Sequence, residues 1–98
     1  MTTPVAFLRA ASAEFDAAAN WYRQRRAKLG EAFINSIQRV LDRVAAQPDF
    51  YPLVRDDVRE AIVPRYPFCI YYRQEPDRIV VLSVFHTARD PSVWQLRA

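Results

Sequence analysis

Apolar residues recur with a helical period through the first half of the chain. One set is spaced i, i+3, i+4 and i+7, and a second is spaced i, i+4, i+7, i+8 and i+11, which gathers each set on one helix face. The first set is Phe15, Ala18, Ala19 and Tyr22, and the second is Phe33, Ile37, Val40, Leu41 and Val44. The pattern predicts two amphipathic helices, and Pro48 prevents the second from continuing.

The ends of these helices are predicted from capping and breaking residues. Ser12 stands where an N-cap belongs, with Glu14 and Asp16 in the first turn. The first helix is therefore expected from about Ala13 to Lys28. Gly30 is expected to cap it in a left-handed conformation, with the second helix starting directly afterwards. The two helices should form a tightly joined antiparallel pair.

The second half of the chain favours extended structure. Six of the seven prolines follow residue 47. Three strand candidates follow the stretch Pro48 to Pro52, and the last two are rich in β-branched and aromatic residues: Val58 to Val63, Phe68 to Arg73, and Arg78 to Phe85. The turn sequence Gln74-Glu75-Pro76-Asp77 predicts that the last two pair as a hairpin. Ile79 to Phe85 is apolar nearly throughout, which predicts a central, well-covered strand.

These elements predict one α+β domain over residues 1–98. A short N-terminal strand, Val5 to Arg9, precedes the helix pair, and the three later strands form an antiparallel meander. The helices are expected to pack on one face of this sheet. The connection from Pro48 to Pro52 places two aromatic residues between turn-forming residues, which predicts an ordered connection.

The amino-acid composition excludes several classes of protein. One cysteine, Cys69, cannot form an intramolecular disulfide, and one cysteine with one histidine cannot build a Cys/His zinc site. The single glycine excludes a glycine-rich phosphate loop. Cys69 lies in an apolar strand and is expected to be a core residue, and the pair Asp56-Asp57 is expected to be solvated. No metal or cofactor is expected.

Cellular location is predicted from what the chain lacks. No apolar run approaches the ~20 residues that a membrane span requires. Residues 1–4 have neither the basic region nor the apolar region of a signal peptide. The protein is therefore expected to be cytoplasmic, with no membrane contact.

The net charge of +3 lies entirely in the helical half. Residues 1–47 carry seven basic and four acidic side chains, whereas residues 48–98 carry seven of each. Four of the cations are clustered in sequence: Arg23, Arg25, Arg26 and Lys28. This basic cluster fits an acidic partner or nucleic acid, and it also fits a solvated last helical turn whose cations complement the helix dipole.

The richest candidate chemistry is the segment His86 to Trp94, directly after the most apolar strand. His86 and Arg89 can converge there with Arg59 and Arg65 on a phosphate-binding groove. An imidazole can then serve as general acid or base in RNA cleavage, with guanidinium groups stabilising the developing charge. In the alternative, His86 makes a backbone hydrogen bond, Arg89 pairs with a carboxylate and Trp94 closes the core. The residue types leave both interpretations open.

The order of elements and several short motifs resemble the ParE branch of the RelE/ParE toxins from about Val5 to Trp94. The motifs follow one another at similar spacing over nearly the whole domain. They are Trp21-Tyr22, Gly30-Glu31-Ala32-Phe33, Pro48-Asp49-Phe50-Tyr51-Pro52, Arg59, Tyr66-Pro67-Phe68-Cys69-Ile70-Tyr71-Tyr72, and the segment His86 to Trp94.

This resemblance implies the toxin of a type II toxin–antitoxin pair, a system of plasmid or chromosomal maintenance. A ParD-like antitoxin is expected to bind the toxin in a hetero-oligomer, with its carboxylates meeting arginines. The basic cluster Arg23, Arg25, Arg26 and Lys28 is the surface expected to meet it. In the ParE branch the target is DNA gyrase, whose inhibition arrests growth. For that target the expected binding residues are His86, Arg89 and Trp94.

The RelE branch implies a different activity, ribosome-dependent cleavage of mRNA. Its cleavage relies on a cationic cluster that includes lysines and commonly on a tyrosine near the carboxyl terminus. Here the only lysine is Lys28, and Trp94 stands where that tyrosine is sought. The sequence therefore favours a non-enzymatic gyrase inhibitor that does not bind nucleic acid directly. If the protein is a nuclease, the candidate catalytic residues are His86, Arg89, Arg59 and Arg65.

Overall fold

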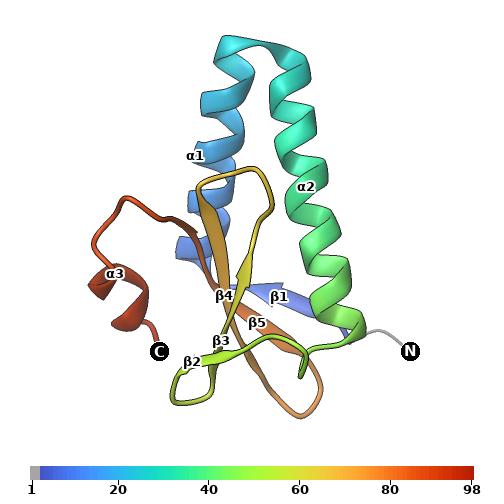
Figure 1. Cartoon of the computed structure of the whole chain (residues 1–98), viewed down its shortest axis with the longest axis vertical. Helices are drawn as coiled ribbons and strands as arrows, with labels where there is room; N and C mark the ends of the chain where they lie inside the picture. Colours follow the sequence, from blue (N-terminus) through green and yellow to red (C-terminus); the bar gives the residue numbers. More distant parts are fainter. Residues whose placement is uncertain (1–2) are drawn as a thin grey trace.

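A five-stranded sheet in the order β1-β5-β4-β3-β2 forms the centre of the molecule (Figure 1). The computed structural model describes residues 3–98. The strands are β1 (Val5–Phe7), β2 (Leu53–Arg55), β3 (Val58–Ile62), β4 (Phe68–Gln74) and β5 (Ile79–His86). The helices are α1 (Arg9–Arg25), α2 (Ala27–Ala46) and α3 (Ser92–Gln95). Strand β1 pairs with β5 in parallel, and all other neighbours are antiparallel.

The predicted α+β class is confirmed. Strands β3, β4 and β5 form the expected antiparallel meander, and a backbone hydrogen bond of 2.8 Å from the Glu75 N–H to the Arg78 carbonyl closes the expected hairpin turn. Strand β5 lies between β1 and β4, and all its residues except His86 are buried. The sequence does not predict two of the observed elements, β2 and α3. Strand β2 is three residues long and wholly exposed, and α3 has only four residues, so neither carries a periodic signal.

The start of α1 differs from the prediction. The helix begins at Arg9, and Ser12 lies inside it, donating its backbone N–H to the Leu8 carbonyl at 3.0 Å. Leu8 is the N-cap and makes no side-chain capping bond. It is also the single residue between β1 and α1, so the chain enters the helix directly from the sheet. A side-chain cap is therefore not what sets this helix start.

The predicted role of Gly30 as a left-handed helix cap is wrong. Helix α1 ends at Arg25, and one extended residue, Arg26 (φ −167°, ψ 133°), separates it from α2, whose first turn contains Gly30. Gly30 does not have a positive φ. A Cβ at this position would overlap Cγ of Arg23 and lie 3.2 Å from its Cα. The glycine therefore permits the two helices to approach closely beside their turn.

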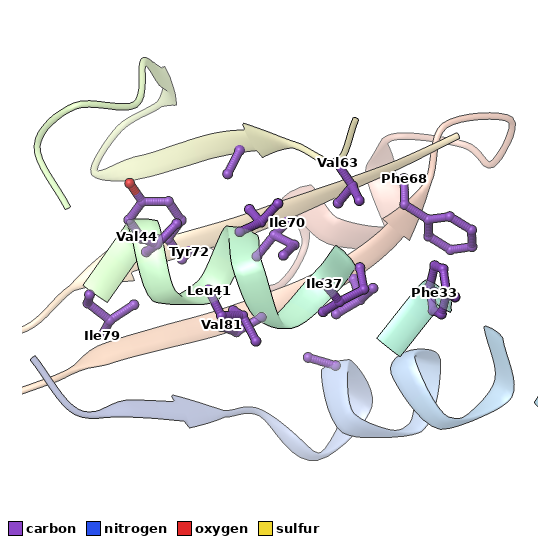
Figure 2. Close-up of a cluster of buried hydrophobic side chains, with 14 of the residues drawn as sticks. Phe33, Ile37, Leu41, Val44, Val63, Phe68, Ile70, Tyr72, Ile79 and Val81 are labelled. Atoms are coloured by element: carbon purple, nitrogen blue, oxygen red, sulfur yellow. The ribbon is translucent and has the colours of Figure 1, made fainter. Parts of the chain in front are cut away.

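The main core lies between the helix pair and one face of the sheet (Figure 2). Phe33 of α2 is fully buried, and its ring centroid lies 4.9 Å from that of Tyr22 and 5.2 Å from those of Tyr66 and Phe68. Further along α2, side chains of its periodic face point at the sheet in Figure 2: Ile37, Leu41 and Val44. The apolar period in the sequence thus corresponds to the face that builds the core.

A second, smaller core covers the opposite face of the sheet. There Trp94 of α3 is stacked on Tyr71, with centroids 4.0 Å apart and planes at 10°. Cys69 belongs to this cluster and is 7% exposed, as expected of a core residue. Burial raises the pKa of its thiol, which keeps it protonated and unreactive.

Candidate functional site

A groove of about 620 Å³ runs between α1 and the end of the sheet at which β5 finishes. Its apolar walls are Ala13, Ala17, Ala18, Trp21 and Tyr22 from α1, with Pro67, Phe68 and Val84 from the sheet side. Its polar residues are Glu14, His86 and Arg89. The groove exists because α1 presents alanines to this part of the sheet, and their short side chains leave space that larger residues would fill.

Two aromatic residues of α1 form the deep and the outer wall of the groove. Tyr22 is held by its stacking on Phe33 and belongs to the core. Trp21 is 49% exposed, and the Arg25 guanidinium carbon lies 3.3 Å from a Trp21 ring centroid. An exposed aromatic ring with a cation on its face is a common element of protein-binding surfaces.

His86 ends β5 at the mouth of the groove. Its ring packs edge-on against Phe68 with centroids 5.1 Å apart. Nδ1 accepts a 3.0 Å hydrogen bond from the Ala88 backbone N–H, so in the neutral ring the proton is on Nε2. A further backbone bond of 3.0 Å from the Arg89 N–H to the His86 carbonyl tightens the turn and brings both side chains to the groove.

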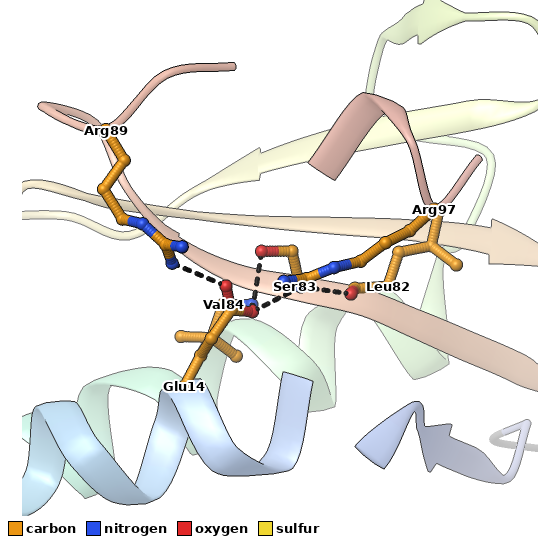
Figure 3. A network of polar contacts seen from close by, with 6 residues as sticks. All are labelled: Glu14, Leu82, Ser83, Val84, Arg89 and Arg97. Atoms are coloured by element: carbon orange, nitrogen blue, oxygen red, sulfur yellow. Dashed lines mark hydrogen bonds and ion pairs between the residues drawn. The ribbon is translucent and has the colours of Figure 1, made fainter. Parts of the chain in front are cut away.

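Glu14 is the centre of a polar network beside this turn (Figure 3). Its side chain is 11% exposed. Oε1 accepts hydrogen bonds from Ser83 Oγ at 2.8 Å, from the Val84 backbone N–H at 3.3 Å and from Arg97 at 2.7 Å. Oε2 accepts from Arg89 at 2.8 Å. Two guanidinium groups face one carboxylate, so the cluster keeps a net positive charge.

The structure brings together only part of the predicted site. His86 and Arg89 both line the groove, whereas Arg59 and Arg65 do not. The Arg59 guanidinium donates to the Asp49 carbonyl at 3.2 Å and to the Tyr51 carbonyl at 2.6 Å, so it holds the 48–52 connection in place. Arg65 has a left-handed backbone (φ 70°) in the turn before β4.

The third expected target-binding residue lies away from the groove. Trp94 is 5% exposed and stacked on Tyr71 in the core of the opposite face. These three residues make the contacts of the second interpretation in the sequence analysis. His86 accepts a backbone hydrogen bond, Arg89 pairs with a carboxylate, and Trp94 packs in a core.

The basic cluster Arg23, Arg25, Arg26 and Lys28 surrounds the turn of the helix pair, where all four side chains are exposed. Two of them make uncharged contacts: Arg23 donates to Asn20 Oδ1 and Arg25 to the Trp21 carbonyl, both at 3.2 Å. Within residues 3–98, none of the four forms an ion pair with a carboxylate. The cluster is therefore an exposed cationic surface that continues toward Trp21 in the groove wall.

Sequence reasoning missed Glu14 as a site residue and placed it in the first helical turn. Its partners Ser83, Arg89 and Arg97 are 69, 75 and 83 residues away, so no local motif joins them. One signal was available: Glu14 shares a helix face with Ala18 and Trp21, at i+4 and i+7, and is the one acidic residue on that alanine-rich face.

Two other structural features are absent from residues 3–98. No group of three or more His, Cys, Asp or Glu side chains is placed to hold a metal ion. Helices long and apolar enough to cross a membrane are likewise absent from this part of the chain.

Comparison with known proteins identifies the family. The model of the family described as the ParE toxin of the type II toxin–antitoxin system parDE matches residues 5–91. A solved structure described as the chromosomal ParDE TA system from P. aeruginosa has the same fold, with a TM-score of 0.62 at 20% identity over 87% of this chain and 96% of that one. No curated protein matches. Because the family model covers most of its length, the chain belongs to the ParE toxin family of type II toxin–antitoxin systems.

Proposed function

We propose that this toxin arrests growth by binding DNA gyrase in the cytoplasm and that a ParD-like antitoxin neutralises it. The match to the ParE family over residues 5–91 carries the proposal. The groove supports it, because an apolar cleft with an exposed Trp21 and a cationic rim suits a protein partner. His86 and Arg89 are the residues through which the groove is expected to meet the target.

The positions of the cations favour a binding protein over a ribosome-dependent endoribonuclease. Cleavage of RNA needs several cationic groups around one phosphate. Here the Arg59 guanidinium is held by the carbonyls of the 48–52 connection. Only His86 and Arg89 of the four nuclease candidates line the same groove.

The test of the target is inhibition of gyrase supercoiling by the purified protein. We expect concentration-dependent inhibition, weakened at least tenfold in the double variant His86→Ala, Arg89→Ala. Arg78→Ala is the matched control, because within residues 3–98 Arg78 forms an ion pair only with the nearby Glu75 on the hairpin turn. Absence of inhibition by the unaltered protein, together with codon-specific mRNA cleavage on ribosomes, would refute gyrase as the target.

The exposed basic cluster is the surface proposed to meet the antitoxin. Its four cations lack carboxylate partners within the described residues, so an acidic segment binds there without displacing internal ion pairs. Such attraction between opposite charges speeds association and is screened by salt. An acidic, partly disordered antitoxin segment is the chemistry that fits this surface.

Reversing this charge is expected to weaken antitoxin binding at least tenfold at low salt. The variant is Arg25→Glu, Arg26→Glu, Lys28→Glu, and its affinity is measured by titration with the ParD-like antitoxin. Arg23 is left in place because its side chain packs against Gly30. The control Arg9→Glu, Arg39→Glu, Arg43→Glu changes the net charge equally at exposed sites elsewhere. If the two variants bind the antitoxin with equal affinity, the basic cluster does not contact the antitoxin and is only a solvated helix end.

A further inference from the structure

The two carboxylate oxygens of Glu14 have different partners. Oε1 accepts from Ser83 and Val84, which are buried, and from Arg97, which is partly buried, whereas Oε2 accepts from Arg89 alone among residues 3–98. The side chain of Arg97 is 19% exposed and that of Arg89 is 45% exposed. One oxygen thus faces β5 and Arg97, and the other faces Arg89 (Figure 3), which lines the groove.

Glu14 lies beside a bulge in β5. The register against β4 shifts between Tyr71 and Tyr72, so that Ser83 opposes Tyr71, Val81 opposes Tyr72, and Leu82 is an extra residue. A bulge of this kind disrupts the ladder locally and leaves backbone groups in need of partners. Here Arg97 donates to the Leu82 carbonyl at 3.0 Å, and Glu14 accepts from the Val84 N–H.

We propose that Glu14 is a positioning residue with two tasks. Through Oε1 it docks the carboxyl-terminal segment, residues 87–98, on the bulge of β5, and through Oε2 it fixes Arg89 at the mouth of the groove. The second task rests on the proposed function, in which Arg89 meets the target. The first task depends on the fold alone.

The electrostatics of the cluster support this arrangement. A carboxylate that is 11% exposed is stabilised by the four donors around it, and removing it leaves Arg97 part-buried without its counter-charge. Arg89 keeps its charge and about half its surface after pairing, so it remains able to bind an anionic group while its guanidinium is held in one place. Fixing a binding group before association reduces the entropy lost on binding.

The test measures hydrogen exchange by mass spectrometry in Glu14→Ala and Glu14→Gln. In Glu14→Ala both arginines lose their partner, and exchange across residues 87–98 is expected to rise at least tenfold, with α2 and β4 unchanged. In Glu14→Gln one oxygen can still accept from Ser83, Val84 and Arg97, but the amide nitrogen cannot accept from Arg89. The increase should then be confined to residues 87–91.

Two further variants make the outcome decisive. Arg97→Ala breaks the same dock without altering α1, so it should reproduce the faster exchange beyond residue 91 even if Glu14→Ala does not fold. Asp16→Asn, at an exposed site on the same helix that has no ion pair within residues 3–98, should leave exchange unchanged. Unaltered exchange of residues 87–98 in Glu14→Gln and Arg97→Ala would overturn docking by Glu14.

Target inhibition separates positioning from simple stabilisation. Glu14→Gln is expected to inhibit the target at least tenfold less than the unaltered protein while binding the antitoxin equally well through the basic cluster. Full inhibition by a variant whose 87–91 segment exchanges faster would overturn the positioning of Arg89. If the unaltered protein leaves gyrase active, the proposed target fails, and the exchange result still decides the docking role.

Discussion

Replacing Phe33 with alanine is expected to lower the free energy of unfolding by about 3–5 kcal/mol, the usual cost of removing a buried phenylalanine. Phe33 is fully buried, and four aromatic rings surround it: Phe15, Tyr22, Tyr66 and Phe68. These rings come from α1, from the β3–β4 connection and from β4. The substitution leaves a cavity between these rings. The rings cannot close this cavity without moving several elements, so it should persist.

Urea unfolding followed by circular dichroism measures this loss. A domain of this size has a total stability of roughly 5–15 kcal/mol, so much of the variant should be unfolded at low urea. Phe50→Ala is the matched control, because Phe50 is 75% exposed and its loss should change stability by less than about 0.5 kcal/mol. A loss below about 1 kcal/mol in Phe33→Ala would contradict this account of the core.

Stability is also expected to fall as the pH rises above about 10, the ordinary pKa of tyrosine. Burial raises the pKa of Tyr72 to about 12, and its hydroxyl donates to the Pro48 carbonyl at 2.7 Å. Burial, with a hydrogen bond to Glu60, also raises the pKa of Tyr71. Above pH 10 the unfolded chain loses these protons before the folded chain does, so deprotonation favours unfolding.

The expected loss from Tyr72 is about 3 kcal/mol between pH 10 and 12, because each pKa unit corresponds to roughly 1.4 kcal/mol. Urea unfolding at a series of pH values measures the slope of stability against pH. Tyr72→Phe and Tyr71→Phe should each remove the contribution of one proton from this slope, which is about 1.4 kcal/mol per pH unit. The double variant should remove the contribution of two protons. An unchanged slope in Tyr72→Phe would contradict the assignment of the lost proton to this hydroxyl.

The fold was predictable where one periodic face extends over many residues. The apolar period of α2 and the long apolar run of β5 each report burial directly, so the helix pair and the meander were expected correctly. The break between the helices was not, because a single extended residue, Arg26, makes it, and arginine has no special preference for that conformation. Gly30 was assigned to that break although its actual role, close packing against Arg23, is a tertiary contact.

The candidate site was predictable only in part for a similar reason. His86 and Arg89 are three residues apart after one strand, so their meeting at one groove follows from local geometry. Arg59 and Trp94 could be placed only by knowing what packs against each face of the sheet. Glu14 binds Arg89 and Arg97, which are far from it in the sequence. A single sequence does not indicate which distant residues pair with a given carboxylate.

The parallel pairing of β1 with β5 has a consequence for how the toxin is made. Val5 pairs with Ile79, and Glu14 pairs with Arg97, so both contacts join the helical half of the chain to the strand half. During synthesis β1 has no partner strand until β5 has left the ribosome, so the sheet cannot be completed before that point. The groove, whose walls come from α1 and from the end of β5, is therefore absent while the helix pair alone has been made, and it forms together with the completed sheet.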